Sequence, residues 1–175
     1  MVRLLQVALC GSLLALVLIT SASCGLAQDL MRRNFRVEGA SMEPTLCNGD
    51  YTRLRRMDDH TVQRGDIIVF RFPLDPTRDF MKRVVGLPRE SVEVRAGDVI
   101  IDGSAIVEPY TLSAPDYTYA PKIVPDGQYF VLGDNRRNSY DSHAWHSQCG
   151  SQQTCDFVPR RYLLGWLPPT AKGCK

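Results

Sequence analysis

The feature that most constrains this chain is a long uncharged segment at its N-terminus. Residues 4–28 contain no Asp, Glu, Lys or Arg, and the segment LLALVLI (Leu13–Ile19) is its most apolar part. At about 1.5 Å per residue, a helix of this length would cross a hydrocarbon core about 30 Å thick. We therefore predict that residues 1–28 form one transmembrane anchor and residues 29–175 a second, extramembrane domain. Two alternatives stay open: a signal peptide cleaved near Ser21–Ser23, and lipidation at Cys24.

Charges on the two sides of this segment give conflicting indications of its orientation. Arg3 favours an N-terminus inside the cell, whereas Arg32, Arg33 and Arg36 follow the segment closely and favour the opposite topology. Charge counting alone leaves the topology open.

Length and charge limit the possible functions of the part of the chain that follows the apolar segment. The whole chain has 175 residues, which suits a single domain with a sizeable core, and a formal net charge of +2. A charge this small, without a long run of one sign, argues against a nucleic-acid partner. The six cysteines are distributed between the apolar segment, position 47 and the C-terminal region.

Beyond residue 30 the sequence has the pattern of a β protein. Short apolar runs occur at 65–72, 79–85, 91–103 and 127–135, and they are separated by Gly, Pro and Asp. The 91–103 segment reads as two strands around Ala96-Gly97-Asp98. Residues 108–126, rich in Pro, Tyr and Ser, are expected to be a long loop or an edge hairpin. The pattern predicts a mostly β domain, a curled antiparallel sheet or sandwich.

One serine stands out as a candidate nucleophile. Ser41 occurs in GASMEPTL, where it could also cap a short helix. A serine hydroxyl needs a neighbouring base, and His60, in the polar stretch MDDHT, is interpreted as a loop residue instead. Lys82 is a better candidate, because on a strand it would share a face with Phe80 and Val84. The strand pattern alone leaves open the alternative that Lys82 extends its amine to solvent at a sheet edge. Apolar neighbours desolvate an ammonium and lower its pKa, so that the lysine can act as a base.

Four segments together resemble the motifs of type I signal peptidases, a family that includes mitochondrial inner-membrane peptidases. They are GASMEPTL, GDIIVFRFP, MKRVVGLP and GDNRRNSYDS, in the family's order and spacing between about Val37 and Gly165. The resemblance implies a membrane-anchored endopeptidase with a Ser/Lys dyad, an all-β catalytic domain outside the membrane, and no cofactor or metal. It also implies an N-terminus inside the cell, membrane lipid as a contact, and preproteins with cleavable signal peptides as substrates.

The resemblance also implies roles for individual residues. Ser41 matches the nucleophile and Lys82 the general base, while Ser139 matches a serine that orients the lysine amine and Asp141 a carboxylate that braces this loop. Gly39 replaces a hydroxyl residue that assists the oxyanion hole in some relatives, so that the hole would depend on the backbone N–H of Ser41. Four further positions match the family's supporting residues: Met42, Pro44, Arg83 and Asp134.

The sequence departs from the family near its C-terminus. His143 stands where an arginine is usual, and HSQCGSQQTC (residues 146–155) is inserted after Trp145. His143, His146, Cys149 and Cys155 are residue types that can bind zinc. Outside the cytoplasm, however, thiols oxidise, and the short spacing favours a Cys149–Cys155 disulfide over zinc or free thiols.

Three function classes are compatible with these features. The favoured one is a bacterial signal peptidase in the cytoplasmic membrane. Mitochondrial inner-membrane and conjugation-type maturation peptidases with the same dyad are alternatives within this class. The other two classes are remote: a non-enzymatic anchored β-sandwich that binds a partner, and a self-cleaving repressor-like protein with the same dyad chemistry. The oligomeric state is left open.

Overall fold

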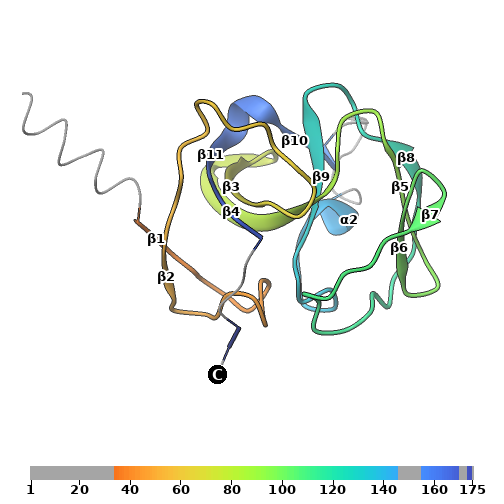
Figure 1. Ribbon diagram of the computed structural model, residues 1–175, viewed down its shortest axis with the longest axis horizontal. Helices are drawn as coiled ribbons and strands as arrows, with labels where there is room; N and C mark the ends of the chain where they lie inside the picture. The colour runs from red at the N-terminus through yellow and green to blue at the C-terminus, as the bar shows by residue number, and fades with distance from the viewer. Residues whose placement is uncertain (1–33, 146–154, 170–172, 175) are drawn as a thin grey trace, which may run out of the picture. The chain divides into compact units, whose positions relative to one another are not determined.

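The computed structural model describes residues 34–145, 155–169 and 173–174 (Figure 1). Apart from Asn34, these residues belong to one compact unit, Phe35–Lys175. The predicted anchor, residues 1–28, and residues 146–154 of the predicted insert lie outside the described residues. No helix within the described residues is long and apolar enough to cross a membrane.

The larger of two main sheets has five antiparallel strands and contains the two apolar runs at 65–72 and 79–85. In spatial order its strands are β10 (Val158–Pro159), β9 (Gln128–Leu132), β4 (Asp75–Gly86), β3 (Ile67–Phe72) and β11 (Leu163–Leu167). The two-residue connection at Pro73-Leu74 turns β3 directly into β4, and Ile68 pairs with Lys82 across this hairpin. The hairpin therefore places Lys82 in the interior of the sheet.

The smaller sheet has four antiparallel strands, and turns that contain Gly or Asp separate three of them. In spatial order they are β7 (Ser104–Ala105), β6 (Asp98–Ile101), β5 (Ser91–Arg95) and β8 (Tyr119–Ile123). Ala96 and Gly97 both have positive φ, as do Asp102 and Gly103. Two consecutive positive φ values define the tight turns that join twisted strands. The 108–126 segment, predicted as a loop or edge hairpin, ends in the edge strand β8.

The two sheets share an apolar core. In Figure 1, β9 lies between the β3–β4 hairpin and the smaller sheet. One cluster contains Val85 of β4, Phe130 and Leu132 of β9, and Val92 and Val94 of β5. A second cluster lies around Phe70 and the fully buried Trp145. Trp145 belongs to a short helix, α2 (Ser142–Trp145), and a 3-10 turn, η2 (Arg160–Tyr162), precedes β11. The mostly β prediction is confirmed.

A two-stranded ribbon carries the segment in which Ser41 lies. Its strands are β1 (Asn34–Arg36) and β2 (Tyr51–Arg53), and the loop between them closes through hydrogen bonds from Val37 N to Asp50 O and from Gly49 N to Val37 O. His60 follows this ribbon and is not a solvated loop residue. Its Nε2 lies 2.6 Å from Asp66 Oδ2, and its ring stacks on Trp166.

Candidate active site

Ser41 and Lys82 lie in direct contact. Lys82 Nζ is 2.8 Å from Ser41 Oγ and 2.9 Å from the carbonyl oxygen of Met81. The lysine is 5 % exposed, on the strand β4 that lies between β3 and β9 in the sheet. Residues separated by 41 positions in the sequence are thus joined by a hydrogen bond on the central strand β4.

Burial changes the proton affinity of Lys82. Desolvation lowers its pKa to about 8, against the opposing effects of the carboxylates of Asp141 and Asp134, which raise it. The amine also lies 5.5 Å from the centre of the Phe80 ring. A lysine with a pKa this close to neutrality is partly deprotonated under physiological conditions and can accept a proton.

The loop that carries Ser41 consists of turns rather than a helix. Glu43 N donates to Ala40 O and Leu46 N donates to Met42 O, but no regular helix continues from these bonds. The alternative reading of Ser41 as a helix cap is therefore wrong. Met42 is 1 % exposed and packs into the third apolar cluster, which anchors the loop, and the Glu43–Pro44 peptide bond is cis.

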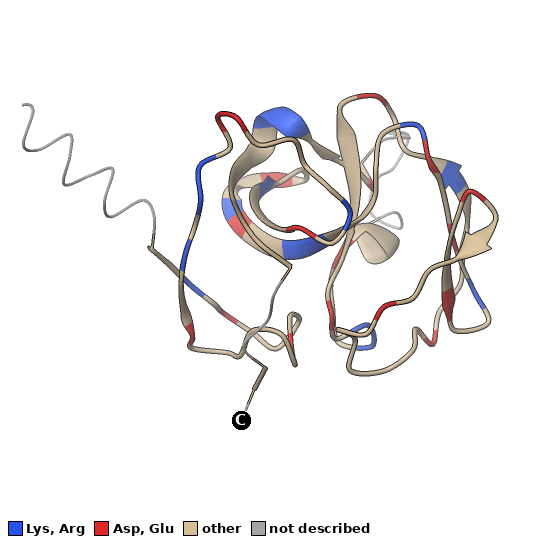
Figure 2. Ribbon diagram, in the orientation of Figure 1, with Lys and Arg blue, Asp and Glu red and all other residues tan. Residues whose placement is uncertain are grey.

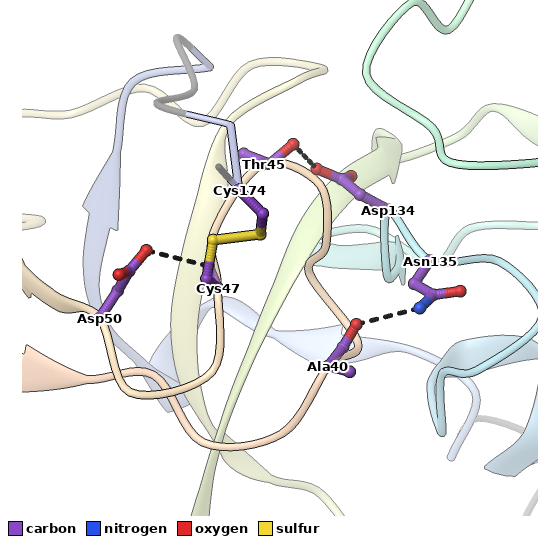
Figure 3. The surroundings of a disulfide bond; sticks show 7 residues. All are labelled: Ala40, Thr45, Cys47, Asp50, Asp134, Asn135 and Cys174. Atoms are coloured by element: carbon purple, nitrogen blue, oxygen red, sulfur yellow. Dashed lines mark hydrogen bonds between the residues drawn. A yellow bond between two sulfur atoms is a disulfide. The ribbon is translucent and has the colours of Figure 1, made fainter.

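The turn 133–136, which directly follows β9, holds this loop from the other side. Asn135 N donates to the carbonyl oxygen of Ser41 and Asn135 Nδ2 donates to that of Ala40 (Figure 3). Gly133 faces the same backbone, since a Cβ built on it would lie 2.4 Å from Ser41 O. Sequence reasoning quoted Asn135 within the GDN motif but assigned it no role.

Arg83 and Asp134 form a buried pair beside the dyad. Arg83 Nε and Nη2 donate to the two carboxylate oxygens of Asp134 at 2.7 and 2.6 Å, and both side chains are fully buried. The hydroxyl of Thr45, in the Ser41 loop, donates to Asp134 Oδ2 (Figure 3). Figure 2 shows how charged segments of both signs follow one another along β4. Thr45 is a supporting residue that sequence reasoning missed.

Asp141 binds both the turn and His143. Its Oδ2 accepts a hydrogen bond of 2.8 Å from Gly133 N, and its Oδ1 lies 2.6 Å from His143 Nδ1. The ring of Tyr117 stacks on the imidazole at 3.6 Å. The structure thus places the imidazole of His143, which stands where an arginine is usual, opposite Asp141.

Two further residues flank the nucleophile loop: Ser139, which was expected to orient the Lys82 amine, and Gly39, which stands where some relatives have a hydroxyl residue. Ser139 Oγ is buried and has no hydrogen-bond partner among the described residues, so that the expected bond to the Lys82 amine is not formed. It nevertheless lies against Gly133, next to Ser41 O. Gly39 has φ +83°, a conformation that L side chains rarely adopt, and its N–H donates to Asn48 Oδ1. Among the described residues no acceptor engages the N–H of Ser41.

A disulfide that sequence reasoning did not pair joins Cys47 to Cys174 (Figure 3). The Cys174 N–H also donates to Pro44 O at 2.8 Å, so that the C-terminal segment is attached to the Ser41 loop twice. Cys155 is buried and disulfide-bonded. Cys149, its predicted partner, and His146 lie outside the described residues, and the Cys149–Cys155 pairing stays a prediction.

A groove of about 460 Å³ opens at the dyad. One wall is the Phe35–Glu38 segment with Ser41 and Met42, and the other is the Arg78–Lys82 segment of β4 with Tyr140. Both walls contain extended backbone of strands β1 and β4. The geometry is that of a serine–lysine pair at the floor of a groove that can admit an extended chain.

Comparisons with known proteins agree with this architecture. The family model described as signal peptidase, peptidase S26, matches residues 10–167. A probable signal peptidase I-2 of Synechocystis is 41% identical over 137 residues, which cover 74% of this chain and 58% of the relative. Signal peptidase I of Leptolyngbya laminosa is 40% identical, with 74% and 63% covered. The chain belongs to the signal peptidase (S26) family.

A solved structure of a signal peptidase also resembles this chain. The crystal structure of a signal peptidase I from Enterococcus faecalis V583 has 30% sequence identity and a TM-score of 0.50, and the match covers 62% of this chain and 97% of that one. The chain spans about three fifths of the length of the first two curated relatives.

Proposed function

We propose that this protein is a serine endopeptidase that removes signal peptides from exported preproteins by Ser/Lys-dyad chemistry. The observation that carries the proposal is the contact of 2.8 Å between Lys82 Nζ and Ser41 Oγ, with the lysine desolvated and the groove open at the serine. Relatives named signal peptidase I in cyanobacteria support the substrate class.

The chemistry follows from the two side chains. Neutral Lys82 accepts the hydroxyl proton while Ser41 Oγ attacks the scissile carbonyl carbon. The lysine ammonium then protonates the leaving amine, which leaves an acyl ester on Ser41. Lys82 next takes a proton from water, which attacks the ester and releases the new C-terminus. The free N–H of Ser41 stabilises the oxyanion, since Gly39 supplies no hydroxyl.

The groove walls suggest how the substrate is held. An extended peptide between the 35–38 and 78–82 segments can form main-chain hydrogen bonds in the manner of an added strand. Ser41 at the floor would then face the scissile bond.

We further propose that residues 1–28 anchor the protein in the bacterial cytoplasmic membrane with the catalytic unit on its outer face. The Cys47–Cys174 disulfide supports this side of the membrane, because structural disulfides persist in oxidising compartments. Membrane lipid would then be the contact of residues 1–28.

The test is incubation of the purified full chain in detergent with a labelled preprotein. Wild type is expected to release the mature product, at a rate that a metal chelator does not change, whereas Ser41→Ala and Lys82→Ala release none. Ser104→Ala, on the exposed strand β7, is the matched control and is expected to retain activity. Cleavage by Ser41→Ala or Lys82→Ala would exclude the dyad.

A further inference from the structure

A group of buried and partly buried charged and aromatic side chains, here called the arginine network, connects the turn 133–136 to the 108–112 segment. Its members are Arg83, Glu108, Tyr110, Asp134 and Arg136. Arg83, Asp134 and Arg136 are at most 1 % exposed. The network contains two cations and two anions, so its formal charges balance. Buried ions at this density require well-defined partners, because each unpaired charge is costly.

Glu108 is the partner of Arg136. Two nitrogens of the guanidinium donate to the two oxygens of Glu108 at 2.5 and 2.8 Å, and Arg136 Nε donates to the carbonyl oxygen of Gly133 at 2.9 Å. Burial lowers the pKa of Arg136, but the hydrogen bonds and charge of Glu108 raise it, and the net direction is upward. Arg136 thus stays charged and ties Glu108 to the first residue of the turn.

Tyr110 connects Glu108 to Arg83. Its hydroxyl donates to Glu108 Oε1 at 2.9 Å, and the centre of its ring lies 3.9 Å from the guanidinium carbon of Arg83. Arg83 therefore has Asp134 along its edge and an aromatic ring over its face. A cation over a desolvated ring is held by the ring quadrupole as well as by packing.

The network reaches the dyad by two routes. Arg83 follows Lys82 in β4 and neutralises Asp134, whose charge acts on the lysine amine. Arg136 is bound to the turn 133–136. This turn also contains Asn135, whose backbone N–H donates a hydrogen bond to the carbonyl oxygen of Ser41. Of the described residues that line the groove, none belongs to the network. Any effect of its members on the reaction would therefore be transmitted through other residues and not through contact with a substrate in the groove.

We propose that Glu108 and Tyr110 are positioning residues for the Ser41–Lys82 pair, which act by fixing Arg83 and Arg136 against Asp134 and the turn 133–136. The proposal rests on the proposed function. Loss of the Tyr110 ring would let Arg83 move from Asp134. The less neutralised carboxylate would then favour the charged form of Lys82.

The experiment compares Tyr110→Leu, Tyr110→Phe and Glu108→Gln in the full chain. We expect kcat to fall about 10- to 100-fold in Tyr110→Leu and Glu108→Gln with KM unchanged, as for a misplaced catalytic group. Tyr110→Phe keeps the ring over Arg83 and is expected to retain most of the activity. The pH–rate profile of Tyr110→Leu should move to higher pH. Tyr162→Leu, which removes the ring beside Arg161 on η2, is the matched control and should leave kcat and the profile unchanged.

A second readout does not depend on cleavage. NMR titration of ¹³Cε-labelled lysine, with the Lys82 signal assigned by its loss in Lys82→Arg, should give a higher pKa in Tyr110→Leu than in wild type. This shift would support the network even if the preprotein were not a substrate, in which case the proposed function alone would fail. Folded Tyr110→Leu and Glu108→Gln with wild-type kcat and titration would overturn the proposal. Failure of both variants to fold would overturn it too, because their role would then be general stability.

Discussion

The amide nitrogen of Asn135 donates to the carbonyl oxygen of Ser41 at 3.1 Å. A turn at the end of β9 thereby holds the backbone of the proposed nucleophile, while β4 supplies the lysine that contacts its side chain. The two partners of Ser41 come from neighbouring strands of one sheet, since β4 and β9 are paired. The position of the serine hydroxyl is therefore a property of the sheet rather than of the loop alone.

The pH dependence of cleavage should follow Lys82. Because the neutral amine is the proposed base, kcat/KM should rise with pH through about 8, the pKa of the buried lysine. The measurement is a pH–rate profile with a peptide substrate. Lys82→Arg should be inactive throughout, since a guanidinium does not deprotonate in proteins. A profile that is flat between pH 7 and 9 would contradict this assignment.

Gly133→Ala should lower kcat strongly, beyond any effect of its lower thermal stability. The new Cβ would lie 2.3 Å from Ser139 Oγ and 2.4 Å from Ser41 O, so that the backbone of the serine must move. Gly165→Ala is a matched control, because its Cβ would lie 2.9 Å from Leu54 Cβ in the core around β11. We expect the Tm measured by thermal unfolding to fall in both variants. We expect kcat to fall about 100-fold only in Gly133→Ala. Equal loss of kcat in the two variants would disprove the specific role of this contact.

His143→Ala should loosen the loop that carries Ser139. It removes the ring nitrogen 2.6 Å from Asp141, and a buried acceptor without its partner costs about 1–3 kcal/mol. His143→Arg keeps a charge opposite Asp141 at every working pH, and we expect it to extend activity on the alkaline side. Denaturant unfolding and pH–rate profiles of the three proteins test both statements. Superimposable profiles would show that His143 has no bracing role.

The Cys47–Cys174 disulfide should contribute strongly to stability. It joins residues 127 positions apart, and loop-closure entropy for a loop of this length corresponds to about 5 kcal/mol. Cys174→Ser should lower the free energy of unfolding by about this amount, as measured by denaturant titration without reductant. A reductant should lower the stability of wild type toward that of the variant. Equal stabilities of the oxidised wild type and Cys174→Ser would refute the prediction.

The predicted Cys149–Cys155 bridge can be tested by peptide mapping without reduction. We expect one linked peptide pair that contains Cys149 and Cys155, and a second that contains Cys47 and Cys174. The short loop between Cys149 and Cys155 should contribute at most about 2–3 kcal/mol. Alkylation of Cys149 without prior reduction would rule the bridge out.

The sequence by itself determined the elements and the two chemical groups of the site. Alternation of apolar residues between Gly, Pro and Asp marked the strands, because a strand buries alternate side chains and turns need special φ values. The apolar neighbours of Lys82 on its strand indicated a desolvated amine before any contact was known. The resemblance of the motifs to those of type I signal peptidases implied Ser41 as its partner, and the structure places their atoms 2.8 Å apart.

Only the tertiary structure decided which distant residues complete the site. Asn135, Thr45 and Tyr110 are ordinary polar residues, and their roles depend on distances across the fold that no local pattern encodes. The pairing of Cys47 with Cys174 likewise depends on where the chain's last residues return, since six cysteines allow many pairings. Local periodicity reports burial along one element, whereas hydrogen bonds between elements depend on how the sheets pack against each other.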